Sequence, residues 1–148
     1  SGREPLDRYL RSQATQEDVR RRMAACFIAT EIATGRIAGF YTLAAADIPV
    51  TDVSPVLTRK LPRYPTIPAA RIGRLAVDQR YRGLKLGSVL LADAATRAAR
   101  SDVAVLAMIV DAKDAAAEAF YRHHGFVAYA SSPGKLLAPL ESLLPQST

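Results

Sequence analysis

The chain has 148 residues, 49% of them apolar, and its 20 Lys and Arg against 14 Asp and Glu give a formal net charge of +6 at pH 7. This length and apolar fraction are enough for one domain with its own core. The single cysteine, Cys26, lies in an apolar run; it excludes a disulfide framework or a zinc cluster and favours a reducing cytoplasm. No apolar stretch approaches the roughly 20 residues that cross a bilayer, so we expect a soluble protein with no membrane partner.

The N-terminal residues show two helical patterns. Apolar side chains at helical spacing follow Pro5, which predicts a short helix over residues 5–12. A capping-box pattern over residues 15–18 is followed by three arginines at 20–22, and it predicts a second short helix.

Strand and turn signals come next. Residues 25–32 and 37–45 are rich in Phe, Ile, Thr and Tyr, and Thr34-Gly35 between them signals a turn, so we predict a hairpin. Five prolines within residues 47–70 are too many for a central strand or a long helix. They predict a long loop with one helical turn that runs from Ser54 to Lys60.

The following segment joins a strand, over residues 71–77, to a helix over residues 87–100 through a basic turn that contains Gly83. A helix start leaves about four main-chain N–H groups unpaired and carries the positive end of the helix dipole, and glycine lets the main chain approach an anion closely. The segment therefore predicts a phosphate-binding turn. Asp93 and Arg97 on the helix are expected to form a surface ion pair. The apolar side of the helix, expected to face the core, consists of Leu86, Leu90, Leu91, Ala94, Ala95 and Ala98.

The C-terminal part alternates strand and helix. The continuous apolar run 103–110 predicts a strand covered on both faces, and Asp114 can cap the helix that follows, which stops at Gly125. Residues 126–130 and 135–140 are the last strand candidates. A hairpin followed by strand, helix, strand, helix and strand indicates an α/β (α+β) layered domain with a mixed sheet.

Two motifs in this order resemble the GNAT family of N-acetyltransferases. The first is Arg74-Leu75-Ala76-Val77-Asp78 leading into Arg82-Gly83-x-x-Leu86-Gly87. The second, about thirty residues later, is Ala119-Phe120-Tyr121-Arg122-His123-His124-Gly125-Phe126, with its Phe-Tyr pair and its Gly-Phe end. The resemblance implies the GNAT fold, a mixed and mostly antiparallel sheet flanked by helices on both faces, in a single domain over residues 1–148. The family normally carries a strand before the point where this chain begins, which leaves open whether that first strand is missing.

The chain is also similar to the toxin acetyltransferases of bacterial toxin–antitoxin pairs. The similar segments are Leu6-Asp7-Arg8-Tyr9-Leu10, Ile37-Ala38-Gly39-Phe40-Tyr41-Thr42-Leu43 and the proline-rich stretch before Gly73. Those toxins acetylate the α-amine of aminoacyl-tRNA and so block translation. The resemblance implies acetyl-coenzyme A (acetyl-CoA) as donor, no metal, aminoacyl-tRNA as acceptor, a ribbon-helix-helix antitoxin as protein partner, and a cytoplasmic homodimer.

The same resemblance implies where the coenzyme binds. Its pantetheine arm would pair with the strand residues Leu75, Ala76 and Val77. Its diphosphate would be held by the main chain of the following turn and helix start, at Arg82, Gly83, Leu84, Lys85, Leu86, Gly87 and Ser88. Lys85 stands where the family has its middle glycine, so either Lys85 tolerates a helical backbone there or the diphosphate contact is altered.

Tyr121 is the expected general acid. A phenol with an ordinary pKa of about 10 can protonate a departing thiolate, whose conjugate acid lies near 8.5, only when it is well positioned. Adjacent helix residues point about 100° apart, so we expect Phe120, implied as a coenzyme contact, to pack into the core while Tyr121 faces the cleft. Glu31 and Asp78 are alternatives for a general base, although an α-amine with an ordinary pKa of about 8 needs little help.

A basic group is the candidate RNA contact, because an excess of cations draws anionic partners. Its members surround the second predicted helix and the proline-rich loop, and they are Arg20, Arg21, Arg22, Arg59, Lys60, Arg63, Arg71 and Arg74.

Two other functions are weighed against the toxin. One is a GNAT enzyme that acts on a small polyamine, antibiotic or peptide amine, which keeps the coenzyme and discards the RNA. The other is a binding module that holds coenzyme A without turnover, which Lys85 in the turn makes conceivable.

Overall fold

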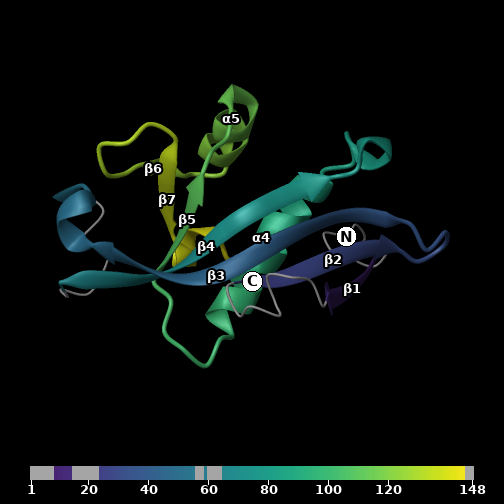
Figure 1. The fold of residues 1–148 in the computed structure, drawn as a ribbon, viewed down its shortest axis with the longest axis horizontal. Coiled ribbons are helices and arrows are strands. Elements are labelled where there is room, and N and C mark those ends of the chain that lie inside the picture. The colour runs from purple at the N-terminus through teal and green to yellow at the C-terminus, as the bar shows by residue number, and fades with distance from the viewer. Residues whose placement is uncertain (1–8, 15–23, 56–58, 60–64, 146–148) are drawn as a thin grey trace. The chain divides into compact units, whose positions relative to one another are not determined.

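The computed structural model describes residues 9–14, 24–55, 59 and 65–145. Figure 1 labels most of the elements that these residues form. In chain order they are β1 (Tyr9–Ala14), β2 (Ala25–Glu31), β3 (Ile37–Pro49), the 3₁₀ turn η1 (Val50–Asp52), β4 (Thr66–Val77), the 3₁₀ turn η2 (Gln79–Tyr81), α4 (Leu86–Ala99), β5 (Ala107–Asp111), α5 (Ala115–His123), β6 (Val127–Ala128), β7 (Lys135–Pro139) and α6 (Leu140–Leu143).

The strands follow one another in the sheet in the order β1-β2-β3-β4-β5-β7-β6. β4 and β5 run parallel, whereas β1 with β2, β2 with β3, β5 with β7 and β6 with β7 run antiparallel. The sheet is therefore mixed and mostly antiparallel, and the predicted α/β class is confirmed.

The chain divides into two compact units, and each is described by itself. The first consists of Ser1–Ala44 and Gly73–Ala94, and the second of Ala45–Ile72 and Ala95–Thr148. Strands β3 and β4 and helix α4 contribute residues to both units.

The helix predicted over residues 5–12 is wrong in the part of this segment that the structure describes. Tyr9–Ala14 is a strand that pairs antiparallel with β2, from Tyr9 opposite Glu31 to Ala14 opposite Cys26. The helical spacing is a local pattern, whereas this strand is stabilised by main-chain pairing with a segment further along the chain. Residues 5–8 and the second predicted helix, at 15–22, lie outside the described residues.

The predicted hairpin of β2 and β3 is confirmed and is longer than expected. The two strands pair antiparallel with a register shift after Ala29, and in the turn the N–H of Gly35 donates to the carbonyl of Glu31 at 2.8 Å. β3 continues to Pro49 instead of ending near residue 45. Pro49 ends the strand, where its missing N–H costs little pairing.

The proline-rich loop is shorter than predicted, because β4 begins at Thr66 and not at residue 71. The carbonyl of Pro68 accepts from the N–H of Leu106 at 2.9 Å, and registered pairing with β5 starts one residue later. A proline near the start of a strand is tolerated because it removes only one donor from the ladder. Residues 56–58 and 60 of the predicted helical turn lie outside the described residues; of its described part, the N–H of Arg59 donates to the carbonyl of Pro55 at 3.2 Å.

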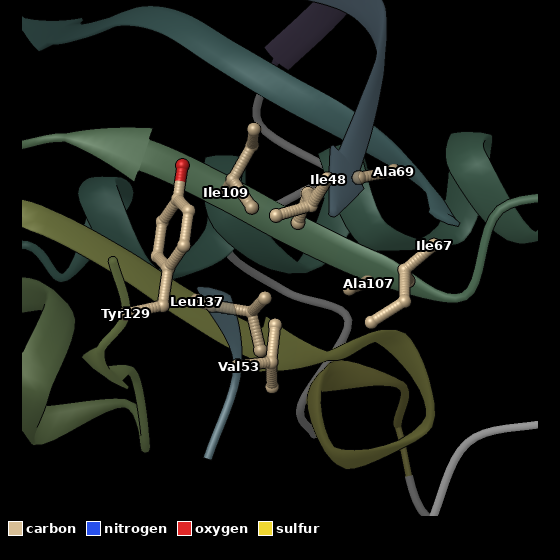
Figure 2. Packing of buried hydrophobic residues seen from close by; sticks show 8 residues of the cluster. All are labelled: Ile48, Val53, Ile67, Ala69, Ala107, Ile109, Tyr129 and Leu137. Carbon is tan, nitrogen blue, oxygen red and sulfur yellow. The ribbon is translucent and has the colours of Figure 1, made fainter. Parts of the chain in front are cut away.

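The core of the second unit gathers around β5 and β7. Figure 2 shows the apolar side chains of this core, none of them more than 7% exposed: Ile48, Val53, Ile67, Ala69, Ala107, Ile109, Tyr129 and Leu137. The strand predicted over residues 103–110 is shorter, because Val103 is 64% exposed and pairing with β4 and β7 begins at Ala107. The four residues Ala107 to Val110 are buried, as the apolar run predicts.

Helix α4 has the apolar stripe that its sequence predicts, since all six residues are 5% exposed or less. Asp93 does not lie at the surface as predicted, because it is only 4% exposed and accepts a hydrogen bond from the hydroxyl of Tyr41. That partner lies on β3, so helical spacing alone does not reveal it.

Helix α5 begins and ends as predicted. The carboxylate of Asp114 accepts from the N–H of Ala117 at 2.8 Å, and Gly125 follows the helix with φ 93°. The two last strand candidates are confirmed as β6 and β7, with β6 reduced to Val127–Ala128. Of the helices within the described ranges, none is long and apolar enough to cross a membrane.

Candidate functional site

The turn between β4 and α4 presents exposed main chain. The N–H of Asp78 donates to the carbonyl of Ala38 at 2.7 Å, and its carboxylate accepts from the N–H of Arg80 at 2.9 Å, which fixes the start of η2. The four residues after η2, Arg82 to Lys85, are all exposed. Solvent and solutes therefore reach the turn directly.

The start of α4 has main-chain donors that its own helix does not use. The N–H of Val89 donates to the carbonyl of Lys85 at 3.2 Å, which is the first bond of the helix. Leu86 and Gly87 precede that bond, so no helical carbonyl lies in position to accept from their N–H groups. The first turn of α4 carries no acidic side chain. Together with the positive end of the helix dipole, these donors make the turn suitable for an anion.

The turn uses two left-handed residues, Gly83 with φ 86° and Lys85 with φ 61°. Lys85 therefore does not have the right-handed helical backbone that the sequence analysis considered. It has the conformation that glycine favours, and an L-residue with a side chain adopts it at a cost of roughly 1–2 kcal/mol. The position keeps the backbone of a glycine while it adds an exposed ammonium group.

Tyr81 anchors the turn to the hairpin. Its side chain is 5% exposed, and its hydroxyl donates to Oε1 of Glu31 at 2.7 Å; the same oxygen accepts from Oγ1 of Thr34 at 2.8 Å. The hydrogen bond with Glu31 raises the pKa of Tyr81 above its ordinary value. Glu31, one of the two residues considered as a general base, thus has a structural role. The sequence analysis assigns no role to Tyr81, although a single aromatic residue between arginines could have pointed to it.

The strand before the turn extends past its parallel partner. Registered pairs between β4 and β5 run from Ala69 to Ile72, whereas β4 continues to Val77. Leu75 and Val77 are half-buried and Ala76 is exposed. These three residues lie beyond the last registered pair with β5, where main-chain groups of a strand can pair with an extended ligand.

Tyr121, on α5 in the second unit, is more buried than predicted. It is 7% exposed, and its ring packs edge-on against Phe126 and Phe120, with centroids 5.2 Å and 5.1 Å away. Burial raises the pKa of Tyr121 to about 12. Phe120 is half-buried, so the expectation that Phe120 packs into the core is wrong. The reason is Phe126, whose N–H donates to the carbonyl of Tyr121 at 3.1 Å and whose ring covers the tyrosine.

Comparison with known proteins assigns the family. Residues 22–128 match the family described as "Acetyltransferase (GNAT) domain". The chain belongs to the GNAT family. As a GNAT protein it is an acetyltransferase, and the resemblance that the two motifs indicate is confirmed.

Two curated relatives of this GNAT chain carry toxin names. It is 34% identical over 139 residues to "tRNA-acetylating toxin" from Mycobacterium tuberculosis (strain ATCC 25618 / H37Rv), covering 93% of this chain and 81% of the relative. It is 28% identical over 126 residues to "Probable toxin TacT" from Sinorhizobium fredii (strain NBRC 101917 / NGR234), covering 79% of this chain and 70% of the relative.

Solved structures share its fold. "AtaT complexed with acetyl-methionyl-tRNAfMet" has a TM-score of 0.75 and 24% identity, over 85% of this chain and 76% of that chain. "Crystal structure of AtaTR bound with AcCoA" has a TM-score of 0.74 and 20% identity, over 93% and 96%.

The structure of the GNAT chain describes part of the predicted RNA-binding group. Arg59, Arg71 and Arg74 are all exposed. The other five predicted contacts, Arg20, Arg21, Arg22, Lys60 and Arg63, lie outside the described residues. Across those parts of the chain that are described, no group of three His, Cys, Asp or Glu could hold a metal ion.

Proposed function

We propose that this GNAT protein transfers the acetyl group of acetyl-CoA to the amino group of aminoacyl-tRNA, and that it acts as a toxin which blocks translation. The observation that carries the acceptor is the 34% identity, over 93% of the chain, to a relative named tRNA-acetylating toxin. The donor is supported independently by the exposed turn at the start of α4.

The coenzyme is proposed to bind along β4 and the turn. The strand edge at Leu75, Ala76 and Val77 pairs with the amides of the pantetheine arm, and the diphosphate accepts from main-chain N–H groups between Arg82 and Ser88. The side chain of Lys85 adds a charge near the diphosphate, as a point charge and not as a fork. Phe120, half-buried on α5, is the proposed apolar contact from the second motif.

Tyr121 is the proposed general acid. The neutral amine attacks the carbonyl carbon of the thioester, the C–S bond breaks, and the sulfur takes the proton of the Tyr121 hydroxyl. The amine nitrogen loses one proton as the amide forms, and that proton returns to the phenolate. Because burial raises the pKa of Tyr121 to about 12, the hydroxyl gives up its proton less readily than an ordinary phenol, and the phenolate recovers its proton readily.

The acceptor needs little activation. The α-amine of an amino acid esterified to tRNA does not require a protein base, because its ordinary pKa of about 8 leaves a usable neutral fraction near pH 7. The proposed RNA contacts are the eight basic residues at 20–22, 59, 60, 63, 71 and 74. Their role is to hold tRNA phosphates, and the exposure of Arg59, Arg71 and Arg74 supports it.

Several features complete the proposal. The chain is proposed to act as a single GNAT domain over residues 1–148, as a homodimer in the cytoplasm, and to be silenced by an antitoxin of the ribbon-helix-helix kind. A structure that shares its fold is named as AtaT bound to the C-terminus of the antitoxin AtaR.

Mass spectrometry of charged tRNA tests the proposal. Protein and acetyl-CoA are incubated with aminoacyl-tRNA, and an N-acetylaminoacyl adduct is expected. A protein that instead acetylates only a small polyamine or peptide amine has the alternative function of a general GNAT enzyme. Binding of coenzyme A without transfer to any amine would contradict both enzymatic functions.

A further inference from the structure

Thr42, on β3, accepts an unusual hydrogen bond from the main chain of β4 through its side chain. Its side chain is 6% exposed, and its Oγ1 accepts from the N–H of Arg74 at 3.0 Å. Strand amides ordinarily donate to main-chain carbonyls of the neighbouring strand. A side-chain hydroxyl that accepts from a strand amide therefore marks a local irregularity in the ladder.

Gly73 makes room for this hydroxyl. A Cβ added at Gly73 would lie 2.6 Å from Oγ1 of Thr42. A side chain at position 73 therefore requires the Thr42 hydroxyl to move, so the glycine and the position of the hydroxyl are matched. In strands, a glycine often marks such a bend or close approach.

The irregularity lies where β4 leaves its parallel partner. The last registered pair of β4 with β5 is Ile72 with Val110, and Gly73 is the next residue. Two residues later β4 reaches Leu75, the first residue of the proposed coenzyme-binding edge. The bond from Arg74 to Thr42 is thus in a position to set the direction of that edge.

We propose that Thr42 is a positioning residue for the coenzyme: its hydroxyl, matched to Gly73, holds the amide of Arg74 and so aims residues 75–77 at the pantetheine arm. This inference rests on the proposed function. Thr42 does not touch the coenzyme, and it acts through the main chain of β4.

Two substitutions separate the hydroxyl from the shape of the side chain. Thr42→Val keeps a branched side chain and removes the acceptor, whereas Thr42→Ser keeps the hydroxyl. If only a fraction of Thr42→Val molecules holds the edge correctly, the apparent Kd for coenzyme A rises by the inverse of that fraction. We expect a rise of about tenfold for Thr42→Val, and less than about twofold for Thr42→Ser, by calorimetric titration with coenzyme A.

The kinetic signature distinguishes positioning from general damage. Thr42→Val should raise the KM for acetyl-CoA while kcat at saturating coenzyme stays within about twofold of wild type. Ile109→Val, which removes one methylene from the core of the second unit, is the stability control and should leave the Kd unchanged.

If Thr42→Val does not fold, a second pair of variants tests the positioning role of Thr42. Gly73→Ala alone should raise the Kd for coenzyme A, because its methyl collides with the hydroxyl. In a Thr42→Ala background, where the hydroxyl is gone, Gly73→Ala should add no further increase.

These experiments distinguish a failure of the role of Thr42 from a failure of the proposed function. A wild-type protein that fails to bind coenzyme A overturns the proposed function. A wild-type protein that binds it, with Thr42→Val within about twofold or Thr42→Ser as weak as Thr42→Val, overturns only the role of Thr42. Equal effects of Gly73→Ala with and without the hydroxyl would also overturn that role.

Discussion

Tyr121 is the residue whose removal should affect chemistry and not binding. We expect Tyr121→Phe to lower kcat by about a hundredfold or more, because the departing thiolate loses its proton donor. The Kd for coenzyme A should stay unchanged in calorimetry, since the ring that packs on Phe126 is retained. Turnover equal to that of wild type would remove Tyr121 from the mechanism.

The raised pKa of Tyr121 also links it to stability. Its folded-state pKa of about 12 lies above the ordinary value of 10.0, so the folded protein holds this proton more tightly. The corresponding stability is fully present below pH 10 and is lost as the pH rises towards 12. Between these limits wild type should lose up to about 3 kcal/mol relative to Tyr121→Phe, measured by urea unfolding. A difference between the two proteins that does not change with pH would contradict the assigned burial.

Lys85 is the second residue with a specific expectation. Because its φ is 61°, Lys85→Gly should be about 1 kcal/mol more stable towards urea than Lys85→Ala, which keeps the left-handed strain. Both variants lack the ammonium, so their difference isolates the backbone. Equal stability of the two variants would show that the residue is not left-handed.

At the scale of elements, the buried bond between Tyr41 on β3 and Asp93 on α4 stabilises the first unit. Tyr41→Phe keeps the ring, which stacks on Phe27 at 5.2 Å, and removes the donor to a buried carboxylate. We expect a loss of about 1–3 kcal/mol in the free energy of unfolding. Tyr129→Phe is the matched control: its ring is buried too, but among the residues that the structure describes its hydroxyl has no hydrogen-bond partner. Equal losses for the two variants would count against the bond.

The elements also show what the sequence could predict. The hairpin, the basic turn, α4 and α5 follow from local signals, such as the cap at Asp114, and the structure confirms them. The sequence predicts a helix in place of β1 because the partner strand, β2, is not part of the local pattern. In the same way, which of the side chains of Phe120 and Tyr121 is buried depends on Phe126, a residue beyond the helix. Helical periodicity alone does not show which of two adjacent aromatic side chains a later residue covers.

At the scale of the whole molecule, the positive charge predicts a strong dependence of tRNA binding on salt. Each phosphate contact contributes a slope of about 0.7 to 0.9 in log affinity against log salt. Arg71→Gln and Arg74→Gln should each reduce the slope by about that amount, whereas Arg100→Gln, an exposed control outside the proposed group, should not. Filter binding at several salt concentrations measures the slope, and an affinity that is independent of salt would exclude phosphate contacts.

The central claim is that main-chain donors at the start of α4 bind the diphosphate of the coenzyme. Calorimetric titration with coenzyme A and, separately, with pantetheine tests it most directly, because pantetheine has the arm and lacks the diphosphate. Charge-assisted hydrogen bonds to the diphosphate predict that coenzyme A binds at least about a hundredfold more tightly. Equal affinity for the two ligands, or no affinity for coenzyme A, would contradict the claim.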